Sequence, residues 1–431
     1  MIRDGSGQRI RKHFAFSSWQ IQALLAGAGI FIGSFDMGAI SDAMSPVKQL
    51  WHVSTAIVAT LGTATLVGMM FGSLTTGMLS DRIGRRLLIV VDVGMFIVGA
   101  ILSALAIDFT MLAIGRLITG FAIGADFAVV FPYVAEIVPH DKRGRSMAWI
   151  MWAANFGVLS SYGLGVAFLS LSQEGWRIVF VVGGVLAIPI LVMRPFIGES
   201  NHWQEQRLPN LSSIAHSLFR RENRKQLIAN TFATFFYQAG DQGLTLVLPL
   251  LLSSVLGASA ATGAAGATAV KAVTIPAALL TVFLIERIGR KRLQIIGFLG
   301  RSIAFSLLGI LLLLSAHISA FWVGILLGLG YFFGAGGPDK TTVIIPAESF
   351  EASTAGSGQG VSQAGGRLGG IVGVTCYGVL DSVFGPGAGM LFFGIAASLG
   401  TFVSLIFVSE TGWQNGEKSY DRHVAENVQT K

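Results

Sequence analysis

The sequence predicts an all-α integral membrane protein, with twelve transmembrane helices in two six-helix bundles related by a pseudo-two-fold axis. Of its 431 residues, 52% are hydrophobic and only 12% are charged, and the mean hydropathy is +0.67. A soluble globular chain carries about 25% charged residues. A basic turn also occurs twice, as Asp81-Arg-Ile-Gly-Arg-Arg86 and Glu286-Arg-Ile-Gly-Arg-Lys291, each between apolar segments. The repeat points to a transporter built from two similar halves.

The chain contains twelve apolar runs long enough to cross a hydrocarbon core of about 30 Å. They lie at 18–43, 53–79, 86–107, 109–138, 145–172, 175–195, 226–256, 262–285, 292–316, 318–347, 355–384 and 387–409. Six runs precede a polar stretch and six follow it. The expected division is a cytoplasmic tail at 1–17, a bundle at 18–195, a cytoplasmic linker at 196–225, a bundle at 226–409 and a cytoplasmic tail at 410–431.

Positive charge is concentrated on one side of the predicted membrane topology. The tails, the linker and the other even-numbered loops hold 22 of the 30 Lys and Arg residues, the opposite loops hold only Lys48 and Arg177, and six lie inside apolar runs. Since Lys and Arg accumulate on the cytoplasmic side, we expect both termini in the cytoplasm and the protein in the plasma membrane. The net charge of +7 is then an orientation signal, and we expect no nucleic-acid partner.

Short motifs lie within several apolar runs or at their ends. They are Gly77-Met-Leu-Ser-Asp81-Arg-Ile-Gly-Arg-Arg86, Gly115-Arg116-Leu-Ile-Thr-Gly120 with Gly124, Pro132, Glu136 and Arg143-Gly144, then Glu199-Ser200 with Trp203, Gly358-Gln-Gly360, Gly366-Arg367-Leu-Gly-Gly370 and Glu410-Thr411. Together they resemble the major facilitator superfamily, and within it the sugar porters and related metabolite:proton symporters. The resemblance covers nearly the whole chain. It implies a transporter whose bundles rock around a midplane cavity, and not an enzyme.

Charged residues at the cytoplasmic ends of the spans are candidates for a gate. Such a network can tie helices together while the inner side is closed. The candidates are Asp81, Arg82, Arg85, Arg86, Glu136, Arg143, Glu286, Arg287, Arg290 and Glu348. The alternative is that these residues are only positive-inside anchors. Ala355 and Val282 stand where the family has an Arg and a Gly, so the second half of the gate is expected to be the weaker one.

Three charged residues inside the first bundle are candidates for proton coupling. Asp36 and Arg116 are each about seven residues from the expected outer ends of their spans, at a depth of roughly 10 Å, so they can pair. Proton symporters of the sugar-porter type are similar at both positions. The alternatives to proton coupling are that Asp36 forms a static buried pair with Arg116 or contacts the substrate directly. Asp126, ten residues beyond Arg116, is a second candidate for a proton or substrate role. The alternative is that Asp126 only forms a hydrogen bond between helices.

The second bundle supplies the candidate substrate-binding residues. They are Gln238, Asp241, Gln242, Lys271 and Arg367, with Asp126 contributing from the first bundle. The sugar-binding pattern of the resembling family is incomplete, because Met151 replaces a Gln of the fifth span. Buried cations favour an anionic or zwitterionic ligand over a neutral sugar. Lys271 could instead pair with Asp241 or Asp339 for structural reasons, and Arg301 and Asp92 are expected to snorkel or to join the gate.

We therefore expect a secondary active transporter that moves a small polar metabolite, an organic acid or a sugar-like molecule, by proton-coupled symport. A proton-independent uniporter and a proton-driven exporter are the alternatives. The expected partners are the substrate, protons and the lipid bilayer, and the expected functional unit is a monomer. We expect no cofactor, no metal site and no catalytic residue. The Gly334-Ala-Gly-Gly-Pro338 segment is a candidate hinge in the tenth span, or a simple kink.

Overall fold

The computed structural model describes residues 18–169, 171–172, 174–200, 216–256, 260–314 and 319–411, which are mostly helical and contain no strand. The helices of the first bundle are α1 (Trp19–Leu50), α2 (Thr55–Ile83), α3 (Arg85–Ala104), α4 (Phe109–Ile137), α5 (Arg143–Leu169) and α6 (Gly175–Met193), with short 3-10 turns η1 (His140–Lys142) and η2 (Arg194–Phe196). Those of the second bundle are α9 (Arg221–Leu256), α10 (Ala260–Ala272), α11 (Thr274–Ile288), α12 (Arg290–Leu314), α13 (Ala320–Gly336), α14 (Pro338–Ser349), α15 (Ala355–Phe384) and α16 (Pro386–Ile406).

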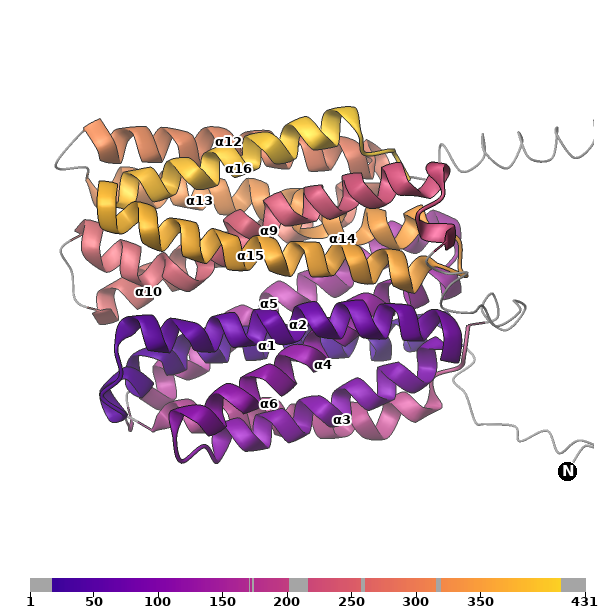
Figure 1. Cartoon of the computed structure of the whole chain (residues 1–431), viewed down its shortest axis with the longest axis horizontal. Coiled ribbons are helices and arrows are strands. Elements are labelled where there is room, and N and C mark those ends of the chain that lie inside the picture. The colour runs from indigo at the N-terminus through magenta and orange to yellow at the C-terminus, as the bar shows by residue number, and fades with distance from the viewer. Residues whose placement is uncertain are drawn as a thin grey trace, which may run out of the picture.

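These helices form the expected twelve spans in two bundles. Figure 1 shows them running along the long axis of the molecule, the N-terminal half below the C-terminal half. Ten spans are long and apolar enough to cross a membrane, and α2 and α9 complete the set. The bundles meet mainly where α15 packs on α2 and where α11 packs on α5.

Several boundaries differ from those predicted. Helix α1 continues through Pro46 to Leu50 rather than ending near 43, and α9 begins at Arg221, inside the predicted linker. The eighth span consists of α10 and α11, and the tenth consists of α13 and α14. Gly337 (φ −141°, ψ −93°) interrupts the tenth span directly before Pro338, which lacks the amide that would continue the helix. Residues 1–17, 201–215 and 412–431 of the predicted tails and linker lie outside the described residues.

The repeated basic turn has the same backbone conformation in both halves. Gly84 separates α2 from α3 at φ 100°, and Gly289 lies between α11 and α12 at φ 95°. Residues with a Cβ rarely adopt this left-handed region, so glycine allows the chain to end one helix and begin the next within one residue. The turn therefore places an acidic helix end beside a basic helix start in each bundle.

Small residues bring α2 close to α4. A Cβ on Gly68 would lie 2.3 Å from the carbonyl oxygen of Leu117, and one on Gly120 would lie 2.2 Å from that of Thr65. Contacts between helix backbones of this kind are how membrane helices associate without a hydrophobic driving force. The resulting packing brings α4 into the middle of the first bundle, where most of its length is buried.

Candidate functional site

One end of the molecule carries the basic turns and the starts of α5 and α15. We call it the basic end, and it comprises residues 81–86, 136–145, 194–200, 286–292 and 348–357. The start of α1 and the segment that follows α16 also lie there. The Lys142 ammonium lies 6.0 Å from the ring of Trp19, and Glu410 accepts hydrogen bonds from the amides of Arg290 and Lys291. The described ends of the chain thus share the side that holds the basic turns, as the topology requires.

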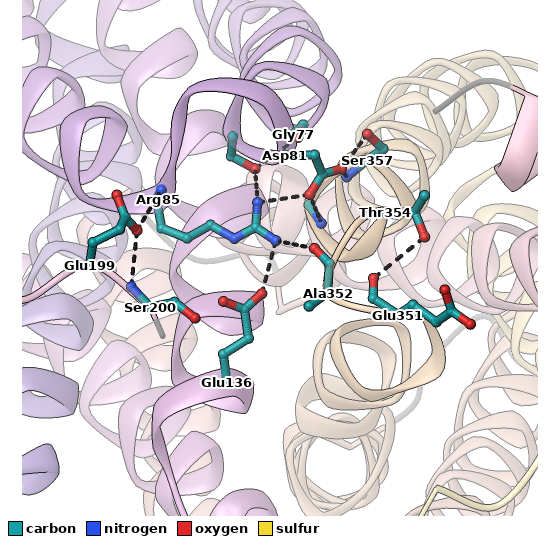
Figure 2. Close-up of polar contacts among 12 residues, drawn as sticks. Gly77, Asp81, Arg85, Glu136, Glu199, Ser200, Glu351, Ala352, Thr354 and Ser357 are labelled. Carbon is teal, nitrogen blue, oxygen red and sulfur yellow. Dashed lines mark hydrogen bonds and ion pairs between the residues drawn. The ribbon is translucent and has the colours of Figure 1, made fainter. Parts of the chain in front are cut away.

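At the basic end, Arg85 links three segments of the chain (Figure 2). Its guanidinium is fully buried and forms ion pairs with Asp81 at 2.7 Å and with Glu136 at 2.9 Å. It also donates to the carbonyl oxygen of Ala352 in the second bundle at 2.8 Å. Glu199 accepts from the Arg85 backbone amide at 3.0 Å, at the start of α3. The arginine therefore connects α2, α4 and the second bundle.

Asp81 completes this contact between the bundles. Its carboxylate accepts hydrogen bonds from the amides of Gly356 (3.0 Å) and Ser357 (2.8 Å) and from the Ser357 hydroxyl (2.5 Å). These donors belong to the first turn of α15, where a helix presents unpaired amides and a partial positive charge. An acid at the end of α2 thus caps a helix of the opposite bundle.

The second half repeats this arrangement with different residues. Arg290 pairs with Glu286 at 2.6 Å and with Glu348 at 3.2 Å. Glu286 accepts from the backbone amide of Arg145 at 3.0 Å, which belongs to the first turn of α5, and Thr411 donates to Glu348 at 2.7 Å. The second half contributes one hydrogen bond between the bundles, from Arg145 to Glu286, whereas Asp81 and Arg85 contribute four. This agrees with the expectation of a weaker second half, since Arg290 finds its carboxylates within its own bundle.

Not every candidate gate residue enters these networks. Arg82 and Arg287 are exposed. Arg86 donates to the carbonyl oxygen of Pro195, and its amide to Glu199, so it fastens α3 to the end of α6 within the first bundle. Arg143 forms no ion pair in the described part of the chain, although it lies near Glu348 and Arg290. The networks centre on one arginine in each half.

Deep in the first bundle, Asp36 and Arg116 form the pair that their spacing predicts. The Arg116 Nη1 donates to Asp36 Oδ2 at 2.7 Å, and both side chains are buried. Ser103 accepts from Arg116 Nε (3.1 Å) and Nη2 (2.6 Å), and the ring of Phe180 lies 4.2 Å from the guanidinium carbon. Arg116 thus keeps partners on α3 and α6 whatever the charge of Asp36.

Asp126 lies in a second buried cluster that involves Arg194. The guanidinium of Arg194 pairs with Asp92 at 2.7 Å and with Asp126 at 2.8 Å, and it is fully buried. It also donates to the backbone oxygens of Leu25, Ala26 and Ile89. Two carboxylates therefore share one arginine. The expectation that Asp92 snorkels or joins the gate was wrong, since it faces inward to Arg194.

Arg194 is a site residue that sequence reasoning missed. It is one of the six Lys and Arg residues inside apolar runs, and a charge at such a position requires a partner or water. Asp92 and Asp126 had no assigned cation, and Arg194 was the only intramembrane cation of the first half besides Arg116. This charge balance could have identified the cluster.

A cavity of about 100 Å³ lies between the two bundles. The first bundle contributes mainly small and apolar side chains, with Ser34, Ser41 and Asn155. The second bundle contributes polar and charged side chains, namely Gln238, Asp241, Gln242, Thr245, Lys271, Thr274, Asp339 and Arg367. All five predicted substrate-binding residues of the second bundle therefore line one cavity.

The proton-coupling candidates do not line this cavity. Asp36 faces Arg116, while Ser34, Met37 and Ser41 of the same helix face the cavity. Asp126 faces Arg194 and lines a separate space of about 20 Å³ with Asp92 and Gly29. The expected contribution of Asp126 to the substrate cavity was therefore wrong, because α4 turns its carboxylate toward Arg194 of η2, the turn that follows α6.

Each carboxylate of the cavity has its own cation. Asp241 pairs with Arg301 at 3.2 Å, and Asp339 pairs with Lys340 and accepts from Asn155 of the first bundle at 2.9 Å. Arg301 is buried among Tyr237, Phe305 and Tyr331, so the expectation that it snorkels to a helix end was wrong.

The cations Lys271 and Arg367 differ from the rest of the cavity. Neither forms a direct ion pair within the described ranges. The Lys271 ammonium is nevertheless attracted by the Asp241 carboxylate, in line with the alternative that it pairs with this residue. Arg367 is 2% exposed, its Nε has no hydrogen-bond partner among the described residues, and its guanidinium lies 5.1 Å from the ring of Phe127. A buried guanidinium without a counter-ion in a cavity is suited to bind an anion.

Comparisons with known proteins agree with this architecture. The family described as "Sugar (and other) transporter" matches residues 23–208 and 204–418. The cis,cis-muconate transport protein of Acinetobacter baylyi is 23% identical, over 95% of this chain and 98% of its own. The glucose transporter GlcP of Staphylococcus epidermidis is 23% identical over 90% and 93%. A probable inorganic phosphate transporter of Arabidopsis thaliana is 25% identical over 81% and 79%.

A solved structure shares the fold. The proton:xylose symporter XylE, bound to 6-bromo-6-deoxy-D-glucose, superposes with a TM-score of 0.78 at 20% identity, covering 92% of this chain and 97% of that one. The family match spans both halves of the chain, and the relatives named above are transporters rather than enzymes. The chain is therefore a multi-pass membrane transporter that belongs to the sugar (and other) transporter family, and it has the fold of the major facilitator superfamily.

Proposed function

We propose that the protein is a proton-coupled symporter of a small organic anion. The observation that carries the substrate class is Arg367, a buried arginine that lines the central cavity and has no ion-pair partner among the described residues. A neutral sugar would leave this charge uncompensated, whereas a carboxylate could form a charge-assisted, bidentate contact with it. Gln238 and Gln242 supply neutral hydrogen-bonding groups nearby, and the buried Oε1 of Gln238 has no partner in the described part of the chain.

Proton coupling is assigned to Asp36 and its partner Arg116. Protonation of Asp36 would remove the attraction across the 2.7 Å contact, while Arg116 would keep Ser103 and Phe180. Helix α1 connects this pair to the cavity. It carries Asp36 on one side, and Ser34, Met37 and Ser41 line the cavity on the other. A small shift of α1 would therefore alter the cavity wall when the carboxylate changes charge.

Asp126 is the second proposed proton carrier. It shares Arg194 with Asp92, and both carboxylates line a space of about 20 Å³, enough for one water molecule. Two carboxylates against one guanidinium carry an excess negative charge that a proton would neutralise. The alternative role is structural, as a link between α3, α4 and the end of α6.

The networks around Arg85 and Arg290 are proposed to be the cytoplasmic gate of an alternating-access cycle in the plasma membrane. Both acids at the turns contact amides of the opposite bundle, which supports the proposal that these networks hold the basic end closed. Opening the basic end would separate Asp81 from α15 and Glu286 from α5. The functional unit is proposed to be a monomer, because one chain supplies both halves of the cavity.

The test is substrate-driven proton uptake by purified protein in liposomes, with sugars, monocarboxylates, dicarboxylates and phosphate as candidate substrates. We expect an organic anion to drive proton entry in the natural protein, and Asp36→Asn to abolish this coupling while binding remains measurable. Reciprocal linkage also requires the anion to bind more tightly as proton concentration rises. Anion uptake without proton movement, unchanged in Asp36→Asn, would identify a uniporter, and anion efflux driven by an inward proton gradient would identify an exporter. Transport of a neutral sugar alone would refute the substrate class.

A further inference from the structure

We infer that the substrate is a small dicarboxylate, with one carboxylate contacted by Arg367 and the other by Lys271. The inference rests on the proposed function, because it specifies which organic anion the central cavity accepts. It follows from the excess of positive over negative side chains that the second bundle places around the cavity.

The second bundle places more cations than carboxylates in and around the cavity. Lys271, Arg301, Lys340 and Arg367 are set against Asp241 and Asp339. Asp241 is paired with Arg301 and also attracts Lys271, and Asp339 is paired with Lys340. Four cations against two carboxylates leave an excess of two positive charges, and Lys271 and Arg367 are the cations that line the cavity.

Lys271 and Arg367 each lie over an aromatic ring, and neither forms a direct ion pair with an acid in the described part of the chain. The Lys271 ammonium lies 4.3 Å from the ring of Tyr331, which belongs to α13 of the second bundle. The Arg367 guanidinium lies 5.1 Å from Phe127, which belongs to α4 of the first bundle. A cation–π contact positions a cation but does not neutralise it. Both charges therefore stay available to a ligand, at a cost of desolvation that an anionic group would relieve.

Two separate anchors favour a ligand with two separate anionic groups. Lys271 is on α10 and Arg367 is on α15, and their aromatic partners belong to different bundles. A dicarboxylate can contact one cation with each end, whereas a monocarboxylate would leave one cation uncompensated. The cavity of about 100 Å³ is smaller than the 300–1,000 Å³ of drug-sized sites, so the dicarboxylate must be short. Inorganic phosphate is also a dianion, but its charge is concentrated in one group.

The experiment measures ligand-induced thermal stabilisation of the full-length protein in detergent, which requires neither transport nor proton coupling. The probes are malonate, succinate, glutarate and cis,cis-muconate, each compared with its monomethyl ester, together with phosphate and xylose. We expect at least one dicarboxylate to bind about 10-fold or more tightly than its ester, since a charge-assisted hydrogen bond contributes at least that factor. Lys271→Gln is expected to reduce this preference to about 2-fold or less.

Two controls separate charge from structural damage. Lys271→Arg keeps the positive charge and should keep the preference for two carboxylates, and Lys48→Gln removes an exposed cation outside the cavity and should change nothing. The inference is overturned if no dicarboxylate binds more tightly than its ester, if phosphate binds more tightly than every dicarboxylate, or if Lys271→Gln keeps the full preference. Stabilisation by esters and diacids alike would leave the proposed organic-anion function intact, whereas stabilisation by xylose alone would refute that function as well.

Discussion

Replacing Arg194 by methionine tests the charge balance of the buried cluster in the first bundle. The substitution keeps an unbranched apolar side chain but removes the only cation that contacts Asp92 and Asp126 in the described structure. Removing one partner of a buried ion pair typically costs about 3–5 kcal/mol, because the other charge remains buried and uncompensated. Here two carboxylates lose their partner, so we expect at least the lower value.

The loss can be followed as a shift in Tm of the purified protein. A change of 1 kcal/mol shifts Tm by about 2–4 °C for a domain of 150–250 residues, the size range of one bundle. A loss of about 3–5 kcal/mol therefore corresponds to a decrease of about 6–20 °C. Intrinsic fluorescence reports this transition, since Trp176 is fully buried in the first bundle. Arg82→Met, at an exposed arginine, is the matched control and should change Tm by less than about 2 °C.

A triple variant distinguishes charge imbalance from simple loss of packing. Adding Asp92→Asn and Asp126→Asn to Arg194→Met removes both orphaned charges, and the three substitutions are coupled because the residues touch. We expect the triple variant to recover at least half of the lost stability. A triple variant no more stable than Arg194→Met, or an Arg194→Met protein as stable as the Arg82→Met control, would refute the reasoning.

Two further predictions concern the gate and the helix packing. Asp81→Asn removes the charge that caps α15 and pairs with Arg85, so the basic end should open more often. In a protein with Cys376→Ser and Ala352→Cys, adding Asp81→Asn should make the cysteine at position 352 react about 10-fold faster with maleimide. An unchanged reaction rate would contradict a gating role. Gly68→Leu should prevent folding, because a Cβ there lies 2.3 Å from a backbone oxygen of α4, whereas Gly94→Ala meets nothing within 4 Å and should be tolerated. Expression and monodispersity in detergent measure both glycine variants.

The sequence by itself determined the fold class, the number of spans and one of the buried pairs. Twelve runs of apolar residues are visible because a lipid core requires about 20 apolar residues for each crossing. The repeated basic turn indicated two similar halves, and the depth of Asp36 and Arg116 predicted their 2.7 Å contact. These features depend on local composition or on one simple length, the rise per residue of a helix.

Only the tertiary structure decided which charges share a partner. The rotation of each helix about its axis sets whether a carboxylate faces the cavity or a neighbouring helix. In α1, Asp36 faces Arg116 while the next residue, Met37, lines the cavity. Composition does not specify that rotation, because it results from packing against several helices at once. Asp126 therefore faces Arg194 rather than the substrate cavity, and Lys271 and Arg367 line that cavity without a direct ion pair among the described residues.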